Sequence, residues 1–97
     1  MMDDLEFEWD PAKGASNLIK HGMTFAEAAQ VFDDPHFIGD DTTKPEHQKT
    51  RQRAVGKLES RSIAVILTER GDCRRIISAR RARTDERRRY DQGKTTR

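Results

Sequence analysis

The sequence predicts an α+β fold, in which two N-terminal helices and a C-terminal helix pack on a small, mostly antiparallel β-sheet. Three observations lead to this prediction. Apolar residues recur at helical spacing near the N-terminus, short β-branched runs separated by turn-like segments follow, and a charged segment with a helix-capping signal closes the chain. The 97 residues form a single domain over 1–97, whose ordered core is expected over about residues 7–91 with frayed termini.

A first helix is expected over residues 11–21, directly after a short edge strand at 7–9. Asp10 can accept hydrogen bonds from the first turn, Pro11 suits the first helical position, and Gly22 suits a left-handed cap at the far end. Apolar residues recur at helical spacing along this helix at Ala12, Ala15, Leu18 and Ile19. We therefore expect this stripe to cover an apolar surface.

A second helix begins after Thr24, which can form a capping box with Glu27 three residues later. Met23 can pack on Ala28 as a hydrophobic staple, and the Asp-Asp-Pro sequence at 33–35 ends the helix. The apolar stripe of this helix consists of Phe25, Ala28, Ala29 and Phe32. This stripe must also cover an apolar surface.

The surface that the helices cover is expected to be a sheet of short strands. These strands are predicted at residues 36–40, 52–56, 62–68 and 75–80. Residues 63–67 are apolar on both faces, which indicates a central strand. Residues 69–72 predict an antiparallel hairpin, and the polar residues 41–50 predict a mobile loop. Thr84 should cap a final helix over 85–91.

Arg80 is predicted to stand at the end of the last strand. Side chains alternate between the faces of a strand. The two expected sets are Ile77 with Ala79, and Ile76 with Ser78 and Arg80. An arginine on a strand is positioned more firmly than one on a loop, and its planar fork can bind a phosphate through two hydrogen bonds. We therefore predict that Arg80 binds the scissile phosphate of a substrate.

Charge is divided unevenly along the chain. Residues 1–50 hold four Lys or Arg and eleven Asp or Glu, whereas residues 51–97 hold fifteen and six, so the two halves carry −7 and +9. Such asymmetry favours a polyanionic ligand, with nucleic acid as the first candidate and an anionic membrane as the second. The membrane is the weaker candidate, because no predicted helix combines a basic face with a large apolar one.

The cysteine and histidine content argues against a disulfide or a zinc site. Cys73 is the only cysteine, and the three histidines are scattered. The acidic N-terminus lacks a basic segment followed by an apolar run, and no stretch approaches the roughly 18 apolar residues of a membrane span. These observations predict a protein of a reducing compartment, the cytoplasm.

Metal-independent cleavage of RNA is the chemistry that this composition leaves open. The sequence has no Walker-type phosphate loop, no metal-binding carboxylate cluster and no recognisable serine or cysteine nucleophile. RNA brings its own nucleophile, the ribose 2′-OH, so the protein needs a base, an acid and cations but no cofactor. The alternative is a basic nucleic-acid-binding module without catalysis, in which the arginines only neutralise phosphates.

The candidate proton carriers each have a structural alternative. His21 can serve as an acid or base, or it can cap the C-terminus of the first helix. His47 lies beside Glu46 in the predicted loop, where it can reach a bound strand or remain solvated. Tyr90 can pack in the core, stack on a base or transfer a proton. Residues 87–89 suit the negative end of a surface helix whether or not they bind RNA.

Three stretches carry a resemblance to a known family: FEWDPAKGASNLIKHGMTFAEAAQVFDDP, then RQRAVG, then TERGDCRRIISARRARTDERRRY. Over about residues 7–90 the chain resembles the BrnT toxins of type II toxin–antitoxin systems. The resemblance implies a RelE-like fold and a metal-independent endoribonuclease, an mRNA interferase that inhibits translation. It also implies neutralisation by a BrnA-like antitoxin. The complex would repress its own operon, so that operator DNA is contacted only through the antitoxin.

The resemblance also carries site residues over to this sequence. The residues predicted to be catalytic are Lys20, His21, Arg51, Arg70, Arg80 and Tyr90. Apart from the resemblance, the basic charge of the second half and the loop position of His47 predict RNA binding by Arg74, Arg75, Arg81, Arg83 and His47. Arg74 and Arg81 are expected to be exposed. The chain departs from the family pattern at residues 49–53, which are more polar than the apolar strand often found there.

Overall fold

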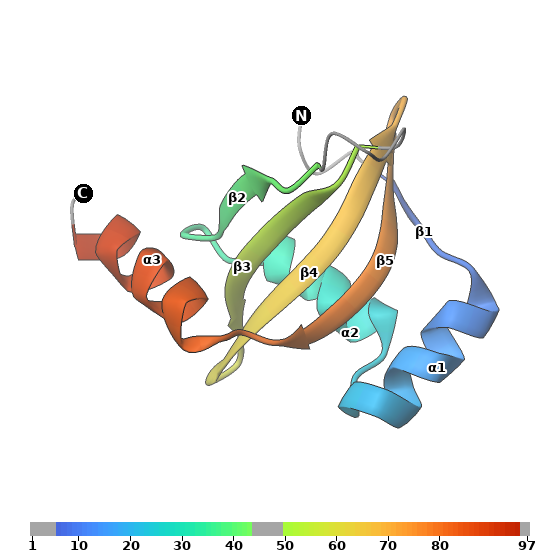
Figure 1. The fold of residues 1–97 in the computed structure, drawn as a ribbon, viewed down its shortest axis with the longest axis horizontal. Coiled ribbons are helices and arrows are strands. Elements are labelled where there is room, and N and C mark those ends of the chain that lie inside the picture. Colours follow the sequence, from blue (N-terminus) through green and yellow to red (C-terminus); the bar gives the residue numbers. More distant parts are fainter. Residues whose placement is uncertain (1–5, 44–49, 96–97) are drawn as a thin grey trace.

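The computed structural model describes residues 6–43 and 50–95, and its elements are drawn in Figure 1. In chain order these are β1 (Glu6–Glu8), α1 (Pro11–His21), α2 (Phe25–Ala29), the 3₁₀ helix η2 (Gln30–Asp33), β2 (Ile38–Asp41), β3 (Gln52–Leu58), β4 (Arg61–Arg70), β5 (Cys73–Arg81) and α3 (Thr84–Thr95). One sheet has the strand order β1-β5-β4-β3-β2, in which only β1 and β5 are parallel neighbours. This confirms the α+β class with helices on a mostly antiparallel sheet.

The helices lie at different places around the sheet, which agrees in part with the predicted arrangement. In Figure 1, α2 passes behind β3 and β4, whereas α3 lies beyond β3 on the side away from α1. β4 is the central strand, as predicted, and it forms an antiparallel hairpin with β5 through a turn in which Gly71 has a φ of 60°. β3, β4 and β5 are each longer than the sequence suggested, because cross-strand pairing continues up to the turns.

The predicted caps occupy the ends of the first two helices. The carboxylate of Asp10 accepts a hydrogen bond from the Ala12 amide at 2.9 Å, and Gly22 closes α1 with a φ of 67°. Thr24 and Glu27 exchange the two hydrogen bonds of a capping box, each at 3.0 Å. These local signals fix where α1 ends and where α2 begins.

The apolar stripe predicted for α1 does not face the core, and that prediction was wrong. Leu18 is 47% exposed and Ile19 is 86% exposed. The helix is turned so that Gly14 faces the protein instead. A β-carbon at Gly14 would lie 3.5 Å from the ring of Trp9 and 3.6 Å from that of Phe25, ordinary van der Waals distances, so this side of α1 lies against the two rings.

A buried asparagine explains this orientation of α1. Asn17 is 5% exposed, its amide nitrogen donates to the Met23 carbonyl, and its amide oxygen accepts from the Ala79 amide, both at 3.1 Å. β1 pairs with only residues 73–75 of β5, so the edge of β5 beyond them needs another partner. Asn17 supplies that partner, and the polar side chain takes the buried position.

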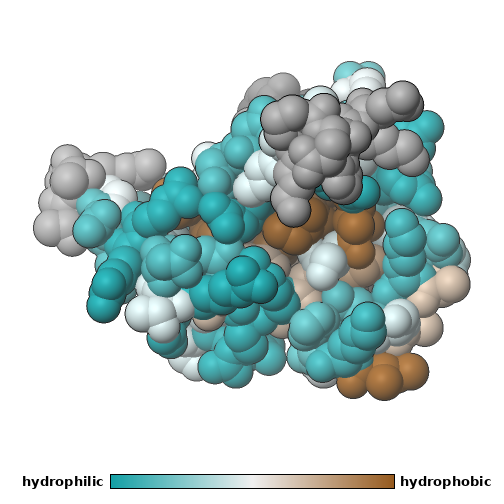
Figure 2. Space-filling model, viewed as in Figure 1, coloured by the Kyte–Doolittle hydropathy of each residue, from teal (hydrophilic) through white to brown (hydrophobic). Residues whose placement is uncertain are grey.

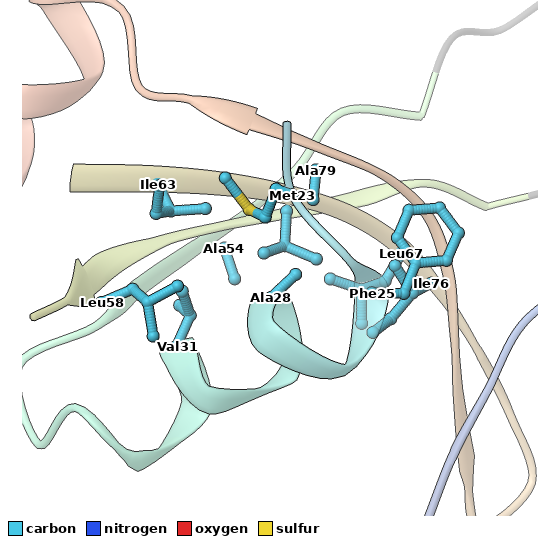
Figure 3. Packing of buried hydrophobic residues seen from close by; sticks show 11 residues of the cluster. Met23, Phe25, Ala28, Val31, Ala54, Leu58, Ile63, Leu67, Ile76 and Ala79 are labelled. Atoms are coloured by element: carbon cyan, nitrogen blue, oxygen red, sulfur yellow. The ribbon is translucent and has the colours of Figure 1, made fainter. Parts of the chain in front are cut away.

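The main core lies between the sheet and α2 with η2, as Figure 3 shows. Its buried members are Met23, Phe25, Ala28, Val31, Ala54, Leu58, Ile63, Val65, Leu67, Ile76 and Ala79. All four residues of the predicted stripe contact this core: Phe25 and Ala28 are buried in it, and Ala29 and Phe32 pack against it partly buried. Val31, which was not in the predicted stripe, is fully buried. The chain tightens to three residues per turn in η2, which places Val31 one turn after Ala28.

A β-bulge in β5 interrupts the alternation of side chains between the two faces of the strand. The register of β4 on β5 shifts between Ile66 and Leu67, so that Ile77 is an extra residue in β5. Ile76 and Ala79 are consequently both buried in the core. Ile77 is half-buried and lines the cavities described below. The expectation that Ile77 shares a face with Ala79 was therefore wrong.

The C-terminal helix is longer than expected, starting one residue earlier and ending four residues later. Thr84, the expected cap, is its first helical residue. At this end of the helix, the carboxylate of Glu86 accepts a hydrogen bond from the backbone N–H of Arg83 at 2.8 Å. The ring of Tyr90 belongs to a second, smaller apolar cluster with Val55. In the described parts of the chain, no helix is long and apolar enough to cross a membrane.

The predicted polar loop is shorter than its composition suggested. Thr42 donates its amide to the Arg51 carbonyl, and the Arg51 amide donates to the Thr43 hydroxyl, both at 2.9 Å. Pairing next to the β2–β3 ladder thus continues into this segment. Residues 44–49, which include His47, lie outside the described residues.

Candidate functional site

The sheet face opposite α2 carries a cavity of about 390 Å³, a volume within the usual range of ligand sites. Its cations come from four parts of the chain. Arg51 precedes β3, Arg70 ends β4, Arg75 lies on β5, and Lys13 lies on α1. The remaining lining residues are Thr50, Thr68 and Ile77.

A second cavity, of about 270 Å³, continues the first along the seam between α1 and β5. The two cavities share Lys13 and Ile77. The second is otherwise lined by Ser16, Asn17, Lys20, His21 and Ser78. We call the two cavities together the α1–β5 groove. Figure 2 shows this face hollowed over β4 and β5, with hydrophobic residues at the bottom of the hollow.

Local structure explains how these side chains come together. Lys13, Ser16 and Lys20 are spaced three and four residues apart, so they lie on one side of α1. The bulge in β5 turns Ile77 away from the core and into the groove. The hydroxyls of Thr50 and Thr68 are 3.3 Å apart and hydrogen-bonded.

The groove is strongly basic. Five Lys or Arg side chains line it, and of the residues that the structure describes no Asp or Glu does. Arg75 donates to the carboxylate of Glu8 at 3.0 Å, but the two side chains are 31% and 38% exposed, and such pairs contribute only about 0–1 kcal/mol. The like charges repel one another unless an anion lies between them. The arrangement therefore suits a polyanion.

Arg80 does not enter the groove as a free cation, so the prediction that it points into a phosphate-binding cleft was wrong. Its two terminal nitrogens donate to the two carboxylate oxygens of Glu86 at 2.7 and 2.9 Å. Arg53 donates to the same carboxylate at 3.0 Å and also binds Asp40, which in turn accepts from Arg89. This network joins α3 to β5, β3 and β2.

Glu86 is the centre of that network. Its side chain is 1% exposed and accepts three guanidinium hydrogen bonds as well as the backbone bond from Arg83. The bonds from Arg80, together with the charge of Arg53, outweigh the effect of burial and lower the pKa of Glu86 from 4.5 to about 2. The carboxylate is therefore ionised at neutral pH, and it holds Arg80 in place.

Tyr90 is enclosed rather than available to a ligand. It is 2% exposed, and its hydroxyl donates to the carboxylate of Asp34 at 2.6 Å. Burial, followed by this bond, raises the pKa of Tyr90 to about 12. Burial by itself would raise the pKa of Asp34, but hydrogen bonds from Tyr90, His36 and Lys57 outweigh it and keep that pKa below its ordinary value. The phenol serves to attach α3 in this conformation.

The predicted RNA-binding arginines are dispersed. Arg74 was expected to be exposed, but it is 7% exposed and its guanidinium carbon lies 4.4 Å from the centre of the Phe32 ring, so this expectation was wrong. Arg75 lines the groove. Arg81 and Arg83 are exposed and do not line it.

Several groove residues were missed by sequence reasoning: Lys13, Ser16, Asn17, Thr50, Thr68, Ile77 and Ser78. The helical spacing of Lys13 and Lys20 was a usable signal for the first of these. The position of Ile77 had no such signal, because it depends on the bulge. Across residues 6–43 and 50–95, no three His, Cys, Asp or Glu side chains are grouped so that they could hold a metal ion.

The fold and the groove define a small, basic α+β protein with a face suited to a polyanion. A family model described as "Ribonuclease toxin, BrnT, of type II toxin-antitoxin system" matches residues 9–86. Because this match spans most of the chain, the protein belongs to that family of ribonuclease toxins, as the sequence resemblance indicated. RNA as substrate and an antitoxin protein as partner follow from this membership. No curated protein matches the chain significantly.

Proposed function

We propose that the protein is a metal-independent endoribonuclease that cleaves messenger RNA, inhibits translation and uses the α1–β5 groove as its active site. The observation that carries this proposal is the set of five cations, without a lining carboxylate among the described residues, in a member of a ribonuclease family. Cations so placed can stabilise the charge that develops on a phosphate during cleavage.

The reaction needs only RNA and proton carriers. A base removes the proton of the ribose 2′-OH, and the 2′-oxygen attacks the neighbouring phosphorus. The bond from phosphorus to the 5′-oxygen breaks, and an acid gives a proton to that leaving oxygen. One product ends in a 2′,3′-cyclic phosphate and the other begins with a 5′-OH, so the atoms balance without a co-reactant.

We assign roles by position in the groove. Arg51 and Arg70 bind the scissile phosphate and the negative charge of the transition state, since both line the larger cavity. Lys20 and His21 at the other end are the candidate proton carriers. Arg80 is a positioning residue in this proposal, because Glu86 occupies its guanidinium. Tyr90 has a positioning role for the same kind of reason: its hydroxyl is bonded to Asp34.

The finer family properties are also proposals. We infer that the fold is of the RelE type, since three helices on a mostly antiparallel sheet agree with it. We further infer that the partner is a BrnA-like antitoxin whose DNA-binding domain lets the complex repress its own operon. The basis for this inference is the family membership.

The test is cleavage of a defined RNA by antitoxin-free protein, with and without EDTA and with and without ribosomes. Wild type is expected to leave 2′,3′-cyclic phosphate ends in EDTA. Arg51→Ala and Arg70→Ala should lower kcat about 100-fold or more, since each removes a donor to developing charge. Arg83→Ala is the matched control, because it removes an exposed arginine that does not line the groove.

Two outcomes would contradict the proposal. RNA left intact by folded wild type under all four conditions would mean that the groove does not cleave RNA. The second outcome is a similar loss of RNA affinity in the Arg51, Arg70 and Arg83 variants, with no separate loss of turnover. This result would indicate a basic binding module that does not catalyse the reaction.

A further inference from the structure

A separate basic cavity of about 390 Å³, which we call the α3 cavity, lies between α3 and the β3–β4 hairpin. The proposed mechanism does not use it. Its lining cations are Lys57, Arg61, Arg81, Arg87 and Arg88. They come from β3, β4, β5 and α3. Asp91 is the one carboxylate among the described lining residues. The five cations outnumber this carboxylate, and an anionic ligand would relieve the repulsion among them.

The structure divides the arginine triplet of α3 into two parts. Arg89 binds Asp40 at 3.2 Å and belongs to the network around Glu86. Arg87 and Arg88 are exposed and line the α3 cavity. The triplet is therefore not a uniformly solvated helix surface, because only two of its members contribute to this site.

The lining points to a phosphate rather than to a base as the ligand. Guanidinium groups match phosphate oxygens through paired hydrogen bonds, and hydroxyls such as that of Ser62 add further donors. In the described lining no aromatic ring is available for a base to stack on. Such a site would hold the backbone of a nucleic acid without regard to its sequence.

The α3 cavity and the groove both reach the part of β5 that leads towards α3. Ser78 lines the groove, and Arg81, three residues further along the same strand, lines the cavity. At about 3.4 Å per residue this separation is roughly 10 Å, the length of a few nucleotides. We propose that the cavity is a second phosphate-binding site, which holds the RNA backbone a few nucleotides from the scissile bond.

This inference rests on the proposed function in that RNA is the ligand, so its test measures binding separately from cleavage. The probe is a single-stranded 2′-O-methyl RNA, which lacks the attacking hydroxyl. About 12 nucleotides at 3.4 Å each give roughly 40 Å, enough to follow a molecule whose longest dimension is 37 Å. Kd is measured over a range of salt concentrations for wild type, the double variant Arg87→Gln/Arg88→Gln, and the control Arg83→Gln.

The double variant should bind the probe at least about tenfold more weakly, and its log–log salt slope should become shallower by about 1.4, because two phosphate contacts are lost. Arg83 was predicted to bind RNA, but it lines neither the groove nor the α3 cavity, so Arg83→Gln should change Kd less than about threefold. With unmodified RNA of the same length, KM should rise for the double variant while kcat stays near wild type, because the groove is intact.

Wild-type Kd and salt slope in a folded double variant would overturn the second site. An equal loss for Arg83→Gln would also overturn it, because net charge would then explain the effect. If the double variant melts at a lower temperature, the two single variants are compared instead, with an expected slope change of about 0.7 each. Wild type that binds the probe but cleaves no RNA would refute the proposed function and leave this site standing.

Discussion

Replacing Glu86 by glutamine should destabilise the protein at neutral pH but have much less effect in acid. The substitution keeps the shape of the side chain and removes its charge from beneath Arg80 and Arg53. Removing one partner of a buried ion pair leaves the other charge without compensation. The effect is expected on the free energy of unfolding, because the Glu86 network holds α3 on the sheet.

The magnitude follows from the pKa of Glu86, which falls from 4.5 to about 2 in the folded protein. At about 1.4 kcal/mol per pH unit, this difference is worth about 3 kcal/mol. The folded pKa is the lower one, so this contribution is complete above about pH 4.5 and is lost as the pH falls towards about 2. At neutral pH, a loss of about 3 kcal/mol lowers the Tm of a domain of this size by roughly 10–20 °C.

The assay is urea and thermal unfolding of wild type and Glu86→Gln at several pH values between about 7 and 3. Asp85→Asn is the matched control, because Asp85 is exposed in the same first turn of α3 and shares any interaction with the helix dipole. The gap between wild type and Glu86→Gln should narrow as the pH falls below about 4.5. A gap that stays constant down to about pH 3, or an equal loss in Asp85→Asn, would refute the reasoning.

Three further substitutions test the packing, each by urea unfolding at neutral pH. Tyr90→Phe should cost about 1.5–3 kcal/mol, since it removes a hydrogen bond to the Asp34 carboxylate; an unchanged unfolding midpoint would mean that this bond does not hold α3. Gly56→Ala should cost about 1–3 kcal/mol, because its β-carbon would lie 2.9 Å from Val31, and wild-type stability would show that this contact relaxes freely. Asn17→Ala should cost about 2 kcal/mol or more by leaving two buried backbone groups without partners, and faster amide exchange at the edge of β5 would accompany it.

The ends of the helices could be predicted because their signals are local. Asp10, Gly22 and Thr24 act on backbone groups within a few residues, so a short stretch of sequence contains all the necessary information. The face that α1 buries could not be predicted in this way. Helical spacing shows that Ile19 shares a side with other apolar residues, but only the uncovered edge of β5 makes Asn17 the residue that turns inward.

The candidate site was predictable in part for a similar reason. Arg51, Arg70, Lys20 and His21 do line one continuous groove, although they are far apart in the sequence. Arg80 was misjudged because a guanidinium fits a carboxylate as well as it fits a phosphate. The sequence shows the arginine but not which of the two will lie opposite it.

The contact between α1 and β5 has a consequence for how the chain avoids self-association. Beyond its short pairing with β1, the outer edge of β5 meets α1 instead of another strand, and the Ala79 amide is satisfied by Asn17. If α1 detached, that edge would present open backbone donors and acceptors beside Ile77, the kind of template on which strands of other molecules add and aggregates grow. The helix that contributes lysines to the groove is thus also the cover that keeps the sheet from being extended.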